Sequence, residues 1–356
     1  MTRRSGDGAF LETRVSLLAE RLLRRNQRQA LVDSSPEEVR PLLELAGLRP
    51  LLEAFPQDSR ALEQALASIL VNETLLLIHG MDSDQRRFIR HWMRRLELIN
   101  LKLILRSKLS GLSASETLEN LLDLGPLTTL PVESLVNTES AEELLRRLES
   151  SPYADMARQA RKVYEEHLNL FDAEATLDTH YFHQLVHLAQ ALPGREGDQT
   201  RCLLGLWLDQ VNLVSLLRFR LTYRLDAPHA YFLLPPGGRH LPQTVLQQLA
   251  QQENLEGMLA RLPAGLREWL EGAPDIETVE SRMIRQVRIA ARKLLRRQGR
   301  GLARAFAWLY LREQQIQLIH TVLKGQLLGL DRALIRHCAN PLANPGNHPA
   351  EGVRAP

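Results

Sequence analysis

Three histidines stand at helical spacing in one stretch of the chain, His180, His183 and His187. Histidines at such spacings can converge on a zinc ion. On a helical wheel, however, they lie opposite the apolar residues Leu185 and Leu188, which predicts a solvated face. No acidic general base stands among them, and the chain has no Cys-x-x-Cys pair. We therefore expect no metal and no cofactor at this position.

A glycine-rich segment, Pro235-Pro236-Gly237-Gly238, is the one place that could suggest phosphate binding. A phosphate-binding loop needs its glycines before a Lys-Ser or Lys-Thr at a helix start, and no such pair follows here. The segment is therefore interpreted as a turn. No nucleotide site is visible in the sequence.

A stripe of arginines is the strongest candidate for a partner contact. Its members fall within a narrow arc of one expected helix, beside apolar residues. Such a stripe is usually a solvated face, but it would also suit an acidic partner or anionic lipid headgroups. Its residues are Arg285, Arg288, Arg292 and Arg296, and a second, weaker cluster holds Arg21, Arg24, Arg25 and Arg28.

Four polar residues interrupt the leucine-rich helices at repeated positions. Glu97 and Asn100 recur as Asp209 and Asn212 at a constant offset of 112 residues. An unpaired amide in such surroundings is costly, so each asparagine is interpreted as a buried interhelical hydrogen bonder that fixes hairpin register. Glu97 and Asp209 lie one turn earlier on the same helices. The alternative is direct contact with a partner.

The elements that position these residues are helices, because Leu is abundant, β-branched runs are rare and no alternating strand pattern of useful length occurs. Turn residues separate the helical stretches at 80–83, 193–197 and 299–301. The fold class is therefore all-α. The long helices are expected at 58–80, 84–112, 153–191, 200–224, 276–298 and 302–329, after a first helix from Phe10 to Leu23.

Composition is that of an ordinary soluble chain, with 356 residues, 44% hydrophobic, 24% charged and a net charge of +3. Two cysteines cannot form a disulfide framework, and the amino terminus carries no apolar leader. The most apolar stretches, near 66–78 and 203–217, contain Asn and acidic residues and fall short of a membrane span. A cytoplasmic location fits these features.

The helices group into three antiparallel pairs, 58–80 with 84–112, 153–191 with 200–224, and 276–298 with 302–329. A short helical tail follows each of the first two pairs, and an N-terminal helix with its own tail lacks a preceding pair. We therefore expect the chain ends to meet, completing three similar hairpin units around a pseudo-threefold axis in a funnel. The expected units are 10–55, 56–150, 151–272 and 273–339, with a disordered tail at 340–356.

At this point the sequence resembles the C-type subunits of V/A-type ATPases, which correspond to the d-type subunits of eukaryotic vacuolar ATPases. The resemblance runs from Phe10 to about Ala339, and it rests on the order of several short segments more than on any one of them. They are Arg86-Arg87-Phe88-Ile89, Glu97 to Lys102, Asp178 to Phe182, Asp209 to Leu213, Tyr231 to Gly238 and the closing helix from Glu313 to Leu330.

The resemblance implies a non-catalytic central-stalk component, peripheral on the cytoplasmic face of a membrane. Its implied partners are shaft proteins of the D and F type and the membrane proteolipid ring, between which it would transmit rotation. It implies no cofactor and no nucleic acid.

Three alternatives remain at the level of the sequence. Helical hairpin periodicity also suits a soluble helical-repeat adaptor. The histidine trio would suit an all-α metal-dependent hydrolase. Nucleic-acid binding would need basic residues interleaved with aromatic ones, whereas the Phe and Tyr residues stand mostly among apolar neighbours.

Overall fold

The computed structural model describes residues 5–53, 58–297, 299 and 301–343, and these residues contain helices and no strand. The long helices are α1 (Ser5–Ala19), α5 (Ser59–Ile78), α6 (Ser83–Ser110), α10 (Ala154–His167), α11 (Leu170–Ala191), α12 (Gly194–Leu217), α17 (Ile276–Leu295), α18 (Gly301–Leu327) and α19 (Arg332–Ala343). The short ones are α2 (Arg25–Asp33), α3 (Pro36–Leu45), α4 (Arg49–Glu53), α7 (Ala114–Glu119), η1 (Gly125–Leu127), α8 (Val132–Val136), α9 (Ala141–Leu148), η2 (Arg218–Thr222), α13 (Ala227–Phe232), α14 (Gln243–Ala250), α15 (Leu255–Ala260) and α16 (Ala264–Leu270). The expected all-α class is confirmed.

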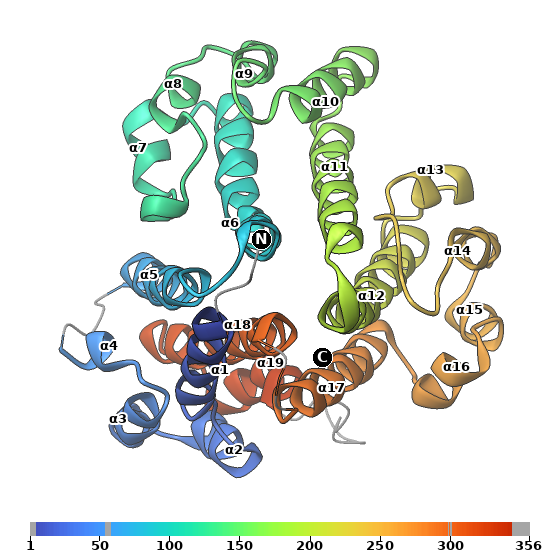
Figure 1. Ribbon diagram of the computed structural model, residues 1–356. Helices are drawn as coiled ribbons and strands as arrows, with labels where there is room; N and C mark the ends of the chain where they lie inside the picture. Colours follow the sequence, from blue (N-terminus) through green and yellow to red (C-terminus); the bar gives the residue numbers. More distant parts are fainter. Residues whose placement is uncertain (1–4, 54–57, 298, 300, 344–356) are drawn as a thin grey trace.

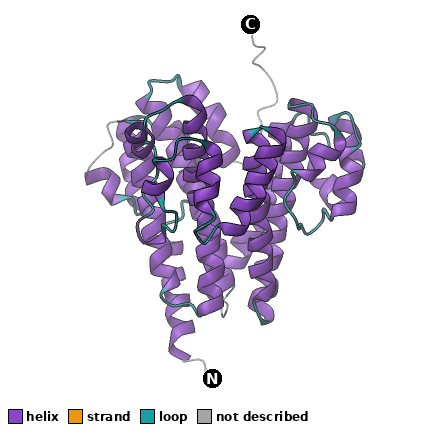
Figure 2. Ribbon diagram, turned by 90° about the horizontal axis from the view of Figure 1, so that it is seen from above, coloured by secondary structure: helices purple, strands orange, loops and turns teal. Residues whose placement is uncertain are grey.

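The long helices form the body, and the short helices lie around its periphery in three groups, α2–α4, α7–α9 and α13–α16 (Figure 1). Seen from above, the long helices run side by side toward the end where α1 begins, and the short helices gather toward the opposite end (Figure 2). Three hydrophobic clusters fill the fold, the largest of them built mainly from long helices.

The hairpin turns lie close to the start of α1. A Cβ placed on Gly80, between α5 and α6, would lie 3.1 Å from the Phe10 ring, and one on Gly301 would lie 2.9 Å from the Leu11 side chain. The N–H of Leu302 donates to Glu196 at the start of α12 at 3.3 Å. The three hairpin tips and α1 therefore meet at one end of the molecule.

The helices pair differently from the expected hairpins. Of the three expected pairs, only α17 and α18 pack closely along each other, whereas α5 packs mainly on α18, and α6 packs mainly on α11. The first hairpin is therefore splayed. Buried polar contacts accompany these pairings, since Glu73 of α5 binds Arg312 of α18 and His91 of α6 lies against the Tyr181 carbonyl of α11.

The expected single helix over 153–191 is wrong. It breaks at Leu168, which adopts a left-handed conformation with φ of 50°, and Asn169 caps the next helix by accepting from the N–H of Phe171 at 2.9 Å. The two pieces, α10 and α11, fold against each other. The helix expected from 200 begins earlier, at Gly194, directly after Pro193.

The disordered tail expected from Asn340 is wrong over its first residues, because α19 continues to Ala343. The rest of that segment, 344–356, lies outside the described residues.

Two helical stretches are long and apolar enough to cross a membrane by length and composition, Ser59–Ile78 and Gly194–Thr222. The sequence expectation rested on the Asn and acidic residues that interrupt these stretches, whereas length and mean hydropathy alone meet this criterion. About half of each lies buried inside the fold, 50% and 56% respectively. This burial arises because α5 and α12 both pack against other long helices.

Candidate functional site

Glu97 and Asn100 on α6 form the first polar cluster. The Glu97 carboxylate is 1% exposed and accepts from the N–H groups of Thr129 and Leu130, the latter at 2.9 Å, and from the Tyr153 hydroxyl. The Asn100 amide exchanges two hydrogen bonds with Leu122, one to its carbonyl at 2.7 Å and one from its N–H at 2.9 Å.

Asp209 and Asn212 on α12 form the second polar cluster. Asp209 accepts from the N–H groups of Arg239, His240 and Leu241 at 2.9 to 3.0 Å, and the His240 ring lies 2.9 Å away. Burial raises the pKa of Asp209, against the lowering by these hydrogen bonds.

The amide of Asn212 makes a single hydrogen bond. Its nitrogen donates to the Gly237 carbonyl at 3.1 Å, and its buried oxygen finds no partner among the residues described. The glycine turn wraps over this cluster. Gly238 has φ of +130°, and a Cβ there would lie 2.7 Å from the Asp209 oxygen, so only glycine fits.

Both asparagines are buried, as expected, but their bonds differ from the expected interhelical ones. Each binds backbone in a loop farther along the chain, at Leu122 between α7 and η1 and at Gly237 between α13 and α14. The physical reason is that buried backbone N–H and C=O groups in a loop have no partners within a helix or sheet. Side-chain carboxylates and amides must therefore form hydrogen bonds with them. The clusters therefore fix the position of a loop on a helix.

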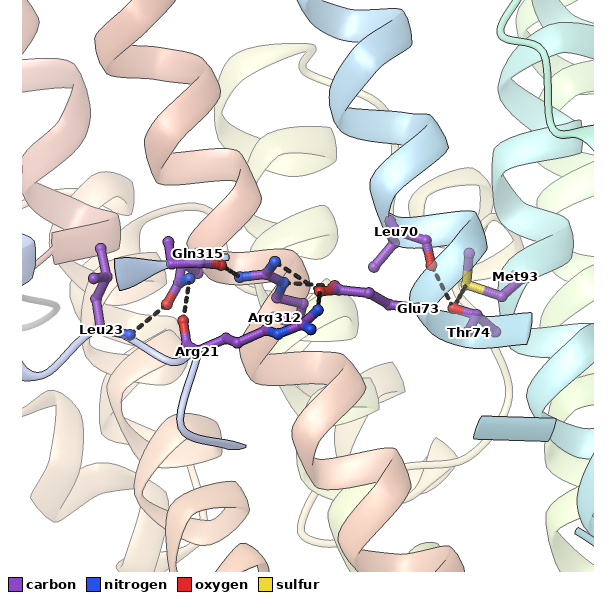
Figure 3. A network of polar contacts seen from close by, with 9 residues as sticks. Arg21, Leu23, Leu70, Glu73, Thr74, Met93, Arg312 and Gln315 are labelled. Carbon is purple, nitrogen blue, oxygen red and sulfur yellow. Dashed lines mark hydrogen bonds and ion pairs between the residues drawn. The ribbon is translucent and has the colours of Figure 1, made fainter. Parts of the chain in front are cut away.

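A third polar cluster, missed by the sequence analysis, joins α5, α18 and the N-terminal segment (Figure 3). Arg312 binds Glu73 through two nitrogens, at 2.7 and 2.9 Å, and donates to the Ala46 carbonyl at 2.8 Å. The Gln315 amide accepts from the N–H of Leu23 at 2.7 Å and donates to the carbonyl of Arg21 at 2.9 Å.

Gln315 follows Arg312 by three residues, as Asn100 follows Glu97. Like Asn100 it accepts from one backbone N–H and donates to one backbone carbonyl, although these belong to two residues and not to one. The +3 spacing of an amide after a charged residue is the signal that could have found it.

A groove of two lobes, here called the central groove, runs between the long helices. One lobe, of about 590 Å³, lies between α6, α11 and α12, and the other, of about 470 Å³, lies between α5, α6 and α18. Arg95, Ile99 and Trp207 line both lobes, which makes them continuous. The walls are largely apolar or aromatic, with Phe171, Phe182, Val211, Phe219 and Tyr223 in the first lobe and Leu66, Leu70, Leu96 and Ile316 in the second.

Several of these apolar side chains are open to solvent, Ile99 at 52% and Tyr223 at 59% exposure. Charged pairs cross the first lobe from α6 to α11, Lys102 with Asp178 at 2.5 Å and Arg106 with Glu174 at 2.5 Å. In the second lobe, burial raises the pKa of Glu313, which Arg95 opposes. Exposed apolar surface of this kind, edged by charge, is typical of an interaction site.

The expected arginine stripe does not form one continuous surface. Arg285 and Arg296 are exposed, but Arg288 is only 6% exposed and Arg292 is half-buried. Arg292 and Arg28 both donate to the Leu23 carbonyl, at 3.4 and 3.1 Å. The inner half of the stripe is therefore turned toward the N-terminal segment and is not free to meet a partner.

Burial and neighbouring guanidinium groups lower the pKa of Arg28, Arg288 and Arg292. The pKa of Arg28 falls to about 9, by burial first and then by the charges of Arg288, Arg292 and Arg25. The pKa of Arg288 falls to about 10, by burial and by Arg292. Both remain charged at neutral pH.

The histidine trio does not converge. His183 and His187 are exposed and His180 is half-buried, with its pKa lowered by burial. No group of three or more metal-ligating side chains gathers in the part of the chain that the structure describes.

The family profile described as "ATP synthase (C/AC39) subunit" matches residues 11–338, nearly the whole chain. The chain therefore belongs to this C/AC39 family, as the resemblance indicated, and is a component of a rotary ATPase of the V/A type.

Several archaeal proteins are similar to this chain over most of its length, and all are C subunits of A-type ATP synthases. The one from Methanocaldococcus jannaschii is 24% identical, over 79% of this chain and 72% of its own. That of Methanothermobacter thermautotrophicus is 27% identical, over 71% of this chain and 65% of its own. That of Thermococcus kodakarensis is 23% identical, over 79% of this chain and 76% of its own.

Proposed function

We propose that this chain is the central-stalk component that couples a rotating shaft to the membrane proteolipid ring, non-catalytic and peripheral on the cytoplasmic face. The observation that carries the proposal is the central groove, combined with membership in the C/AC39 family. The shaft proteins of D and F type are the proposed occupants of the groove.

The chemistry of the groove suits a helical shaft. An apolar stripe on a helix would bury against Ile99, Trp207 and the aromatic side chains of the first lobe, as in other helix-in-groove contacts. The charged pairs at its edge would set the orientation of the shaft more than its affinity.

The proposal includes three similar units around a pseudo-threefold axis. Its support is that Gln315 on α18 binds the N-terminal segment in the manner in which Asn100 on α6 binds its own following loop. In this arrangement the segment 10–55 serves as the tail of unit 273–339, while units 56–150 and 151–272 carry their own tails.

The end of the molecule where the three hairpin tips meet α1 is the proposed seat on the proteolipid ring. Arg285 and Arg296, the exposed members of the arginine stripe, remain proposed contacts for an acidic partner or for anionic lipid headgroups.

A paired-variant pulldown tests the groove. Ile99→Glu introduces a charge at a 52% exposed groove position, and Leu109→Glu does the same at a 60% exposed position of α6 outside the groove. Tagged proteins are recovered from mildly solubilised membranes and their partners identified by mass spectrometry.

We expect wild type and Leu109→Glu to retain the shaft proteins and proteolipid, and Ile99→Glu to lose the shaft proteins with unchanged circular dichroism. Full retention by Ile99→Glu would remove the groove as the shaft seat. Recovery of neither partner by wild type, from membranes that contain the ATPase, would overturn the stalk role and favour the helical-repeat adaptor.

A further inference from the structure

A second concave site, here called the arginine pocket, lies on a face of α6 next to the one that lines the central groove. It measures about 410 Å³ and is enclosed by α6, the start of α10 and α11. Arg87, Arg90 and Arg94 line it from α6 at spacings of three and four residues, which place all three on one helical face. The volume lies in the range of small-molecule sites.

The guanidinium groups of the arginine pocket lack close carboxylates. No described carboxylate lies within 4.0 Å of Arg90 or Arg94, and Arg87 reaches Asp84 only at 3.9 Å. The one acidic residue in the lining, Asp155, already accepts from Arg158. Three positive charges thus face a shared hollow with little compensation, which is a strong attraction for an anion.

Imidazole groups from α11 and α6 also line the pocket. His180 lies half-buried in the lining, and His91 is buried beside it. The His91 Nε2 lies 3.0 Å from the carbonyl of Tyr181, and because a carbonyl only accepts, Nε2 carries a proton. Burial lowers the pKa of His91 to about 4, so its ring is neutral at neutral pH and its other nitrogen is an acceptor.

The remainder of the lining is apolar, with Leu98, Met156 and Leu188. We propose that the arginine pocket binds a phosphate-bearing ligand, with its phosphate held by Arg87, Arg90 and Arg94 and its less polar portion against these three side chains. Guanidinium groups match phosphate oxygens through paired hydrogen bonds, which favours this class of anion. The phosphate can belong to a phospholipid headgroup or to a soluble phosphate ester.

The test uses the double variant Arg90→Gln/Arg94→Gln, whose positions make no ion pair with described residues. Arg94 lies over the Tyr153 ring at 5.5 Å, so circular dichroism checks that the variant keeps its fold. Arg86→Gln is the matched control, because Arg86 is exposed on the same turns of α6 but does not line the pocket. Inorganic pyrophosphate binding is measured by titration calorimetry. Flotation with phosphatidylglycerol vesicles, against phosphatidylcholine vesicles, measures lipid binding.

We expect saturable pyrophosphate binding that weakens about tenfold or more in the double variant and stays unchanged in Arg86→Gln. Flotation lost by the same variant would identify a lipid headgroup as the source, and pyrophosphate binding without flotation would identify a soluble ester. Absence of binding to both probes, or equal binding by the double variant and the control, would overturn the proposal. The result does not depend on the shaft contact, because Arg90 and Arg94 line the arginine pocket and neither lobe of the central groove.

Discussion

The polar clusters of α6 and α12 differ from that of α18 in what they hold. The carboxylates of Glu97 and Asp209 bind loops about 30 residues later in the chain, mainly by accepting hydrogen bonds from backbone N–H groups. Arg312 holds Glu73, 239 residues away, through a buried ion pair. A nearby loop needs only satisfied backbone, whereas distant segments are joined here by a guanidinium that serves a carboxylate and a carbonyl together.

Removal of the buried Arg312 guanidinium is expected to cause the largest loss of stability among the changes that test this comparison. Arg312→Met leaves Glu73 buried, with the partly exposed Arg21 at 3.0 Å as its remaining cation. The expected loss is about 3 kcal/mol of unfolding free energy, because the buried Glu73 keeps only one partly exposed cation and the Ala46 carbonyl loses its donor. Urea unfolding followed by circular dichroism measures it.

Arg146→Met is the control for that measurement, since Arg146 pairs with Glu142 on an exposed helix face, where about 0.5 kcal/mol or less is expected. Similar losses in the two variants would show that the α18 cluster contributes no more than a surface pair.

Acidification tests a further buried polar contact, the one between α6 and α11. There His91 is buried in its neutral form. Its folded-state pKa of about 4 lies below the ordinary 6.5, so the unfolded chain binds more protons between these values. This contribution to stability is complete above about pH 6.5 and is lost as the pH falls toward 4. The full loss is about 3 kcal/mol.

His91→Gln keeps an N–H for the Tyr181 carbonyl but cannot titrate. Unfolding free energies measured from pH 7 to pH 4 should therefore fall by about 3 kcal/mol less in this variant than in wild type. Parallel pH profiles would show that His91 is not the group responsible, since the other titrating groups are common to both proteins.

The difference between the clusters also explains what the sequence could predict. The repeat of Glu97 and Asn100 as Asp209 and Asn212 marked buried positions correctly, because a polar residue among leucines at a repeated offset needs a local partner. The identity of that partner was missed, since a pattern along one helix does not reveal which backbone passes over it. Gln315 and Arg312 were missed because their partners, Leu23 and Glu73, are remote in sequence.

The burial within the arginine stripe was missed for a related reason. Periodicity placed Arg285, Arg288, Arg292 and Arg296 on one side of α17, but it did not reveal that the N-terminal segment covers the middle of that side. The break at Leu168 had a readable signal in the capping residue Asn169, whereas the splaying of α5 from α6 depends on contacts with other hairpins.

Glycine substitutions in the loops of the first two clusters should reduce stability to different extents. Gly238→Ala places a Cβ 2.7 Å from Asp209 at φ of +130°, whereas Gly125→Ala, in the loop of the first cluster, has φ of +48° and open space around it. We expect losses of about 2 to 3 kcal/mol for the former and about 1 kcal/mol for the latter. Thermal unfolding of both variants compares them, and equal shifts in melting temperature would show that the close approach to Asp209 is not limiting.

The smallest expected effects come from the two asparagines. Asn100→Leu removes two hydrogen bonds and leaves both the N–H and the carbonyl of Leu122 without that partner, which should cost about 2 kcal/mol. Asn212→Leu removes one bond, together with an amide oxygen that has no partner in the described structure, so it should loosen packing by only about 1 kcal/mol. Melting temperatures of the two variants test the order. An unchanged value for Asn212→Leu would count against a structural role for that amide, and a larger loss there than in Asn100→Leu would show that its oxygen is satisfied in solution, since the cost of a buried amide depends on the bonds that it makes.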